Sequence, residues 1–228
     1  MPHPNEFFSK EFTLKLYREL GDADIQTKVQ FTLDYIDTVK EDFAPELVEY
    51  MTKTQLANIY FDHQEYEKAM PILEEIYEQE IPENTVLKHL YSLLLIRTHR
   101  LLKNYSRALT LLEENLISKN EEFQGFETLD FLEEYSLLCE VTNWSFDFKF
   151  EPCLTKVVLN LGFPDKPLRP LEKIDFLTET NRNWNIRLGQ ILANSTISQE
   201  SKTELLKSFQ QECPILWYKN LAEKLALT

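Results

Sequence analysis

One fourteen-residue stretch of this chain returns later with a similar pattern of residues. The stretch His63–Ile76 matches the stretch Leu102–Asn115, and the two lie 39 positions apart. Both contain the string Tyr-x-[Lys/Arg]-Ala-x-x-[Ile/Leu]-Leu-Glu-Glu. A string that recurs at such a period is typical of repeat architectures, in which one pair of helices cannot bury its apolar face without a stacked neighbour. The recurring string therefore predicts a fold built from stacked helical pairs.

The composition supports helices in a globular chain. Of the 228 residues, 43% are hydrophobic and only 4 are glycines. So few glycines leave little room for glycine-dependent hairpin turns or phosphate-binding loops. A chain of this length can bury a substantial core without metal ions or disulfides. We therefore expect an all-α fold with no cofactor and no metal.

The cysteines and the apolar segments bear on the compartment. Cys139, Cys153 and Cys213 are widely spaced and form no Cys-x-x-Cys pair, which argues against a disulfide framework and against a zinc site. The N-terminus shows no basic region followed by an apolar stretch, and the apolar run Leu90–Ile96 is too short to cross a bilayer. We therefore expect a cytoplasmic protein.

Acidic residues are concentrated in the first part of the chain. The formal net charge is −14, and residues 1–140 contain 13 Lys and Arg against 28 Asp and Glu, whereas residues 141–228 contain 11 and 10. An acidic field of this kind disfavours nonspecific binding to nucleic acids or anionic lipids. We therefore expect neither a nucleic-acid nor a membrane partner. The charge either favours basic partners or only solvates exposed helix faces.

Periodicity and capping signals predict paired helices through residue 142. Gly21 is placed to end a first helix, Asp22 to cap a second, and Pro45 to open a third at its first position. The helices expected in this part of the chain are 7–20, 23–40, 44–61, 66–80, 84–103, 105–118 and 127–141.

The pattern changes after Asn143. Trp144–Phe150 alternates aromatic and polar residues, which predicts an extended segment. Three prolines between Gly162 and Pro170 predict a stiff connector or, alternatively, a ligand for a proline-binding module. Ser201 and Glu204 form a capping-box pattern. The helices expected here are 152–161, 171–180, 184–193, 202–212 and 215–227.

These signals divide the chain into three parts. Residues 1–142 form a helical repeat region, residues 143–170 hold the aromatic segment, a short helix and the Pro-rich connector, and residues 171–228 form a helical cap or subdomain. A terminal repeat needs a cover for its apolar face, and the aromatic segment with the later helices can supply it.

The repeated region resembles the tetratricopeptide repeat, whose pattern is Leu-Gly/Ala-x-x-Tyr on a first helix, helix A, and Ala-x-x-x-Phe/Leu on a second, helix B. The early-helix Trp of the family is absent, and the step between copies is 39 residues rather than 34. The resemblance covers about residues 10–121. It implies a right-handed superhelical stack of antiparallel helix pairs with a helical C-terminal extension. The residues that carry it are Leu56, Ala57, Tyr60, Ala69, Leu73, Ile76 and Pro82 in the middle copy, Leu95, Ile96, His99, Ala108 and Leu112 in the later copy, and Leu16, Tyr17, Leu20, Val29, Leu33 and Ile36 in a fainter early copy.

In this family the concave face, lined by helix A, binds an extended peptide or a partner helix. Arg97 and Arg100, three positions apart on one face, could hold a carboxylate together, or each could pair with a glutamate across the stack. The Lys-and-Asn clamp that holds chaperone tails in some members is absent, so chaperone binding is not expected. Transferring the groove positions implies partner contacts at Thr54, Asn58, Phe61 and Asp62 from one repeat and at Leu93, Arg97, Arg100 and Leu101 from the next.

The sequence carries no local signature of catalysis. The four glycines are solitary, and the four histidines lack ligand spacing. Adjacent glutamates diverge by about 100° on a helix. We therefore expect the pairs at 74–75, 113–114, 121–122 and 133–134 to form solvated faces.

We expect a non-enzymatic protein–protein interaction module, or adaptor, that binds a peptide or partner segment of unknown identity in the concave groove. Formation of a homo-oligomer is left open. The alternative is an intracellular regulatory sensor that binds a small ligand or signalling peptide within the helical stack. An enzyme whose site is assembled from scattered residues is a third, less favoured reading.

Overall fold

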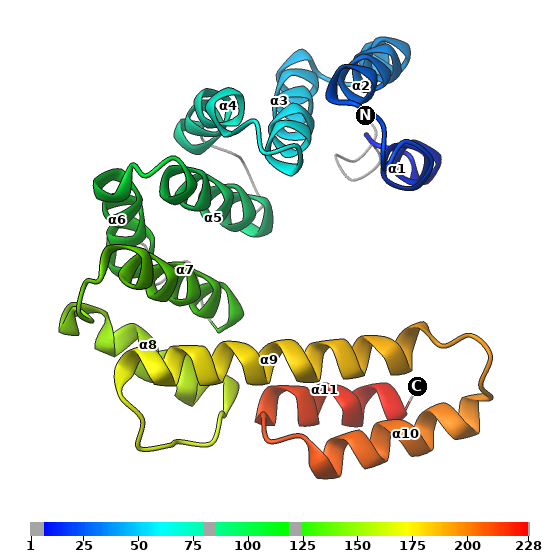
Figure 1. The fold of residues 1–228 in the computed structure, drawn as a ribbon. Coiled ribbons are helices and arrows are strands. Elements are labelled where there is room, and N and C mark those ends of the chain that lie inside the picture. The colour runs from blue at the N-terminus through cyan, green and yellow to red at the C-terminus, as the bar shows by residue number, and fades with distance from the viewer. Residues whose placement is uncertain (1–6, 80–84, 119–124, 228) are drawn as a thin grey trace. The chain divides into compact units, whose positions relative to one another are not determined.

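The computed structural model describes residues 7–79, 85–118 and 125–227. These residues form eleven α-helices and no β-strand, so the predicted all-α class is confirmed for the described part of the chain (Figure 1). The chain consists of two compact units, residues 1–108 and residues 109–228. The division at residues 142 and 170 stays a prediction.

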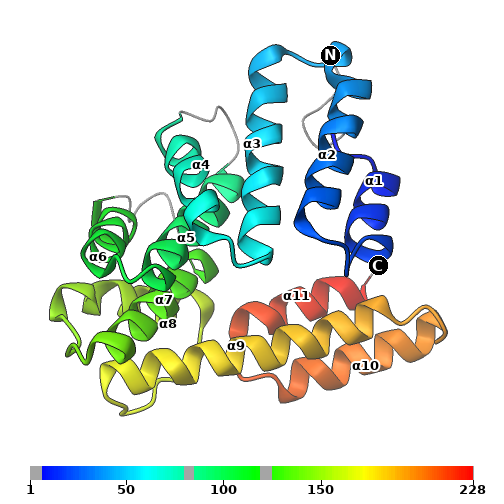
Figure 2. The same cartoon turned by 45° about the horizontal axis from the view of Figure 1, so that its top comes forward.

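Unit 1 is a succession of helices joined by short turns. α2 packs against α3, α3 against α4, and α4 against α5 (Figure 2). This packing of each helix on the next is what a stack of helical pairs requires. The elements are α1 (Lys10–Leu14), a π-helical turn (Lys15–Glu19), α2 (Ile25–Val39), α3 (Pro45–Asp62), α4 (Tyr66–Glu78), α5 (Thr85–Leu101) and the start of α6 (Tyr105–Glu113), whose later residues belong to unit 2.

The two repeated stretches, 63–76 and 102–115, contain the same kind of turn. Gln64 and Lys103 have φ angles of 61° and 62°, in the left-handed region that few residues other than glycine adopt. In each turn the following residue donates its backbone N–H to the carbonyl four positions before the left-handed residue, at 2.9 Å after Gln64 and 2.8 Å after Lys103. The two stretches are therefore similar in structure as well as in sequence.

The helices that follow these turns bury corresponding side chains. Ala69 and Leu73 of α4 are fully buried, and so are Ala108 and Leu112 of α6. A small side chain at a helix crossing lets the two backbones approach closely. The fainter early copy differs, because Leu33, which corresponds to Leu73, is 36% exposed. The packing is thus repeated in the two later copies and not in the first.

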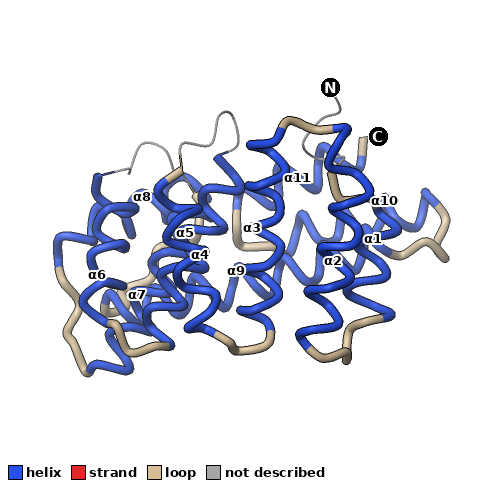
Figure 3. Tube along the Cα trace, turned by 90° about the horizontal axis from the view of Figure 1, so that it is seen from above, coloured by secondary structure: helices blue, strands red, loops and turns tan. Residues whose placement is uncertain are grey.

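Unit 2 contains the longest described helix, α9, and its described helices are joined by turns and loops (Figure 3). α7 packs against α8 and α9, and α10 packs against both α9 and α11. After the end of α6 the elements are a π-helical turn (Glu114–Ser118), α7 (Phe126–Thr142), a 3-10 turn (Phe148–Phe150), α8 (Glu151–Leu161), α9 (Pro170–Ala193), α10 (Gln199–Glu212) and α11 (Leu216–Ala226).

The prediction of two helices at 171–180 and 184–193 is wrong. The structure has one helix of 24 residues, α9. Residues 181–183 are polar, but they include neither proline nor glycine, so nothing in the backbone ends the helix there. Buried Leu177 and Leu188 lie on either side of the polar stretch at helical spacing and hold both halves to the core.

Two predicted helix caps are displaced. Asp24, not Asp22, caps α2, because its carboxylate accepts the Thr27 N–H at 3.0 Å. Ser198 caps α10 by accepting the Ser201 N–H at 3.2 Å, so the predicted capping box at Ser201 lies inside the helix. In both cases a second residue of capping type stands two or three positions away, and the sequence pattern does not choose between them.

The aromatic segment is not extended throughout. Its last three residues, Phe148–Phe150, form a 3-10 turn, and no described strand pairs with the residues before them. Phe150 is fully buried and packs on the Tyr135 ring with centroids 4.4 Å apart, whereas Phe148 is 70% exposed. The aromatic residues of the alternation therefore do not share one buried face, because the turn places Phe150 in the core and Phe148 at the surface.

Gly162 joins the end of α8 to the start of α11. It has a φ of 65°, and its carbonyl accepts the Leu216 N–H at 3.2 Å. A Cβ atom on Gly162 would lie 2.4 Å from the Cβ of Leu216. Only glycine fits this close approach without displacing the backbone.

Two further observations concern the whole of the described chain. Cys139, Cys153 and Cys213 are buried free thiols. Across residues 7–79, 85–118 and 125–227, no helix combines the length and the apolar character needed to cross a membrane.

Candidate partner-binding surface

The predicted contact residues of the middle copy lie on α3 at different depths. Thr54 is buried, and its hydroxyl donates to the Met51 carbonyl at 2.9 Å. Asn58 and Phe61 are half-buried, and the Phe61 ring packs edge-on against Tyr66 with centroids 5.4 Å apart. Thr54 therefore lies below the protein surface, while Asn58 and Phe61 are partly accessible to another molecule.

Asn58 links α3 to α5. Its Nδ2 donates to the Tyr91 hydroxyl at 3.3 Å, and the Thr54 hydroxyl also interacts with Tyr91. The burial of Tyr91 raises the pKa of its phenol, so Tyr91 stays neutral at physiological pH. An amide has two N–H groups and one carbonyl oxygen. The bond to Tyr91 orients the Asn58 amide and leaves one N–H and the carbonyl oxygen for another molecule.

Between Leu90 and Leu101, α5 is accessible along one stripe only. Its accessible residues recur at the three- and four-residue spacing of one helix face, and the residues between them are buried. Leu90 is 50% exposed and Leu101 is 39% exposed, while the two arginines between them are half-buried. The stripe consists of Leu90, Leu93, Leu94, Arg97, Arg100 and Leu101, and these residues together with Asn58 and Phe61 are called the A-face below.

The structure brings Arg97 and Arg100 onto one accessible face, as the spacing predicts. Each of them already has an interaction partner within the chain. A carboxylate from another molecule would therefore join or replace an existing contact. Asp62, also predicted on this face, is exposed at the end of α3.

Sequence reasoning missed a tyrosine and amide cluster next to the A-face. The Gln55 amide donates to the Tyr17 hydroxyl at 3.0 Å, which joins α3 to the π-helical turn after α1. Burial raises the pKa of Tyr50, whose hydroxyl has no hydrogen-bond partner among the described residues. No local motif marks this cluster, because its members come from separate helices.

One predicted solvated glutamate connects three helices of unit 1. The Glu74 carboxylate contacts His99 Nε2 at 2.8 Å and accepts from an Arg107 N–H at 3.1 Å. Burial alone would raise the pKa of Glu74, but the hydrogen bonds from Arg107 and His99 outweigh it and lower that pKa below its ordinary value. Glu134 is likewise not solvated, since it is 1% exposed. The prediction of solvated faces is wrong for these two residues, and the pair at 121–122 lies outside the described residues.

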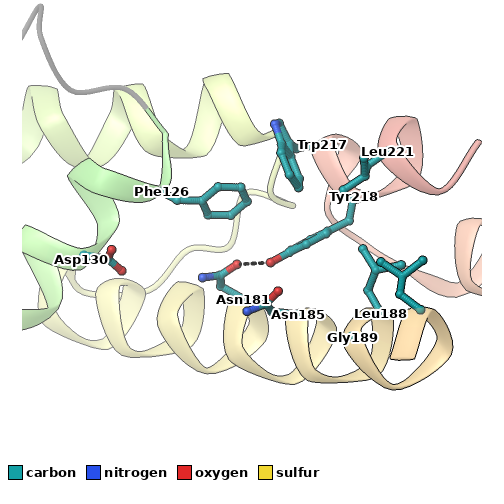
Figure 4. Close-up of a pocket in the computed structure, with 10 residues that line it drawn as sticks. Phe126, Asp130, Asn181, Asn185, Leu188, Gly189, Trp217, Tyr218 and Leu221 are labelled. Carbon is teal, nitrogen blue, oxygen red and sulfur yellow. Dashed lines mark hydrogen bonds between the residues drawn. The ribbon is translucent and has the colours of Figure 1, made fainter. Parts of the chain in front are cut away.

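A pocket of about 430 Å³ lies within unit 2, between α7, α9 and α11 (Figure 4). The Tyr218 hydroxyl donates to Asn181 Oδ1 at 2.9 Å across it. Burial, together with the nearby Cys213 and Asp130, raises the pKa of Tyr218 to about 12, so the hydroxyl keeps its proton. The lining residues are Phe126, Asp130, Asn181, Asn185, Leu188, Gly189, Leu192, Trp217, Tyr218 and Leu221.

The sequence held one overlooked signal for this pocket. Gly189 interrupts a helical pattern, and an isolated glycine in a helix often marks a close approach or a site. A Cβ atom built on Gly189 meets nothing within 4 Å. The remaining lining residues belong to helices distant in sequence, so only the fold brings them together.

Comparison with known proteins does not assign this chain to a family. No protein-family model matches it, no curated protein matches it, and no solved structure matches it. Among the residues that the structure describes, no group of three or more His, Cys, Asp or Glu could hold a metal ion.

Proposed function

We propose that the chain is a non-enzymatic cytoplasmic interaction module of tetratricopeptide-repeat type, and that unit 1 binds a segment of another protein along the A-face. The observation that carries this proposal is the single accessible stripe of α5. All other residues of α5 between Leu90 and Leu101 are buried, and the stripe combines exposed leucines with two arginines. A surface of this composition suits a segment that presents apolar side chains and carboxylates.

Asn58 supplies the polar complement of that surface. Its amide is held by Tyr91, and its remaining N–H and carbonyl oxygen suit the carbonyl and N–H of a peptide backbone. A group that is already oriented loses little entropy on binding. The repeated left-handed turns and the fully buried Ala69 and Ala108 support the repeat type, and the right-handed superhelical stack is part of the proposal.

A sensor is the second candidate function. The pocket of unit 2 favours it, because a concave site with apolar walls and a few polar groups is the usual form of a small-ligand site. A module that binds a protein segment with one unit and a small ligand with the other would combine both functions.

The test begins with selection of random phage-displayed peptides on the immobilised chain. Calorimetry then compares the affinity of a selected peptide for the wild type and for two variants. Asn58→Asp can accept a bond from the Tyr91 hydroxyl in place of the bond that Asn58 donates, but it has no N–H to offer a peptide, and it should weaken binding about tenfold. The double change Arg97→Ala/Arg100→Ala should weaken the binding of an acidic peptide by about 2–5 kcal/mol.

Asn160→Ala, at an exposed position of α8, is the matched control and should leave the affinity unchanged. Melting temperatures are measured on the same samples. A lower melting temperature with unchanged affinity would show that the arginines only hold the stack together. Selected peptides that bind all variants equally would show that the A-face is not the binding surface.

A further inference from the structure

The pocket of unit 2 has one acidic end and one aliphatic end. Asp130 lies near Phe126 and Asn181 at the acidic end, and Leu188 and Leu221 line the other (Figure 4). Among the described residues that line the pocket, Asp130 is the only charged one, and none is Lys, Arg or His. The charge of the lining is therefore complementary to a cation. Asp130 already has an interaction within the chain, so the cation would join or replace it.

The polar groups at the acidic end are one carboxylate and two amides, and amides can accept as well as donate hydrogen bonds. The Tyr218 hydroxyl donates to Asn181, and Asn185 lies one helical turn further along α9. A carboxylate with amide carbonyls beside it offers several acceptors for the N–H groups of one ligand head. The charge of the carboxylate favours a primary ammonium or a guanidinium over an anion.

Aromatic rings form the wall of the pocket. The Phe126 and Trp217 rings meet edge-on, with centroids 4.8 Å apart and planes at 90°, and Tyr218 packs edge-on against Trp217 at 5.1 Å. Ring faces attract cations and also pack well against hydrocarbon. Trp217 is 41% exposed, so part of this wall is open to a ligand.

The floor of the pocket leaves room for a hydrocarbon body. Gly189 has no side chain where one would fill the pocket, and a Cβ atom there has no neighbour within 4 Å. From Asn181 to Leu192 the floor follows α9 for about 16 Å, at 1.5 Å per residue. A ligand with a polar head and an unbranched body matches the change from amides to leucines along this floor.

We propose that this pocket binds a small amphipathic organic cation, whose ammonium or guanidinium head lies at Asp130 and Asn181 and whose hydrocarbon body lies along Leu188, Gly189 and Leu221. The site is independent of the A-face, because every lining residue belongs to unit 2. The cation has two chemical sources, a free amine or a basic side chain of a peptide.

The test uses three probes of one shape at neutral pH: n-hexylammonium, 1-hexanol and hexanoate. Calorimetry and tryptophan fluorescence measure binding to the full chain, and Trp217→Phe identifies the signal from the pocket. n-Hexylammonium should bind at least ten times more tightly than 1-hexanol, and hexanoate should not bind. Nα-acetyl-lysine amide, measured in parallel, distinguishes the two sources: tighter binding than n-hexylammonium assigns the cation to a peptide, and weaker binding assigns it to a free amine.

Three variants link the binding to the pocket. Asp130→Asn should weaken n-hexylammonium at least tenfold and leave 1-hexanol unchanged. Glu127→Gln, which removes the same charge from α7 without lining the pocket, is the matched control and should leave both affinities unchanged. Gly189→Leu fills the floor at an open position and should abolish binding without lowering the melting temperature.

The outcomes that overturn the proposal are distinct. Equal binding of n-hexylammonium and 1-hexanol, or an affinity for n-hexylammonium that Asp130→Asn leaves unchanged, would show that the pocket does not select a cation. The absence of saturable binding by both cations in the wild type would show that the pocket binds neither form of this ligand class.

Discussion

Unit 1 uses one arrangement more than once, whereas unit 2 is built from elements that occur once. In unit 1 the turns at Gln64 and Lys103 share their φ angles and hydrogen bonds, and each is followed by a helix with a fully buried alanine. In unit 2 the 24-residue α9 has no counterpart of similar length among the described helices. The comparison teaches that repetition makes local structure predictable, while the single elements depend on contacts between distant segments.

The repeated positions also show how far the equivalence extends. Glu74 contacts His99 and Arg107. Glu113 holds the corresponding position in the later stretch, and its carboxylate accepts a hydrogen bond from Lys149 Nζ at 2.6 Å. In both copies a glutamate of the second helix pairs with a basic residue that comes later in the chain. The position is repeated, but the partners are different, so each copy is adapted to its own neighbours.

The largest expected effect concerns the alanines of the repeat. Ala69→Leu or Ala108→Leu should each destabilise the protein by about 1–3 kcal/mol, because both sites are fully buried at close helix crossings. Ala222→Leu, at a fully buried site in α11, should cost a similar amount. Urea unfolding measures the loss, and hydrogen exchange locates it. Exchange should rise in α3 and α4 for Ala69→Leu and in α10 and α11 for Ala222→Leu. Unchanged unfolding for both repeat variants would show that these alanines do not form the close crossings of the stack.

An intermediate effect concerns Glu74. Glu74→Gln should lower the free energy of unfolding by about 1–2 kcal/mol at pH 7, because it weakens charged hydrogen bonds to His99 and Arg107. Glu75→Gln affects an exposed pair with Lys53 and should change stability by less than about 1 kcal/mol.

The pH dependence of the same variant follows from linkage. The pKa of Glu74 is lowered in the folded state, so its contribution is complete above its ordinary value of 4.5 and is lost as the pH falls through the folded value. The stability difference between wild type and Glu74→Gln should therefore shrink below about pH 4.5. Unfolding free energies measured from pH 7 down to pH 3 test this. A difference that does not change with pH would mean that the carboxylate is not charged and paired in the folded protein.

The smallest expected effect concerns the repeated turns. Gln64→Gly and Lys103→Gly should each stabilise the protein by about 0.5–1 kcal/mol, because glycine adopts the left-handed conformation without steric cost. Glu67→Gly, inside α4 at an exposed position, should instead destabilise by about 1 kcal/mol. Thermal melts compare the three. If one of the two turn variants stabilised the protein and the other destabilised it, the two turns would be equivalent in sequence only.

Sequence reasoning succeeded where one short string determines the local structure. The helices around Tyr66 and Tyr105 and the first position of Pro45 in α3 are found as predicted. It failed at α9, where the decision between one helix and two depends on burial of Leu177 and Leu188 against other elements.

The candidate sites show the same limit. Spacing placed Arg97 and Arg100 on one face of α5, and the resemblance to the repeat family predicted that this face is accessible. It could not show that Thr54 is buried, nor that Tyr91 reaches Asn58 from another helix. For the pocket of unit 2 the sequence offered only the isolated Gly189, because Asp130 and Tyr218 become neighbours only when α7 and α11 are folded together.

The close contact between Gly162 and Leu216 restricts which amino-acid substitutions are tolerated at position 162 in homologous proteins. A side chain at position 162 would have to displace the start of α11, and with it the pocket wall at Trp217. We therefore expect natural variants to retain glycine at this position even where the surrounding surface has diverged. A glycine after a short helix, followed by a proline-rich loop, would then be a marker by which distant relatives of unit 2 can be recognised.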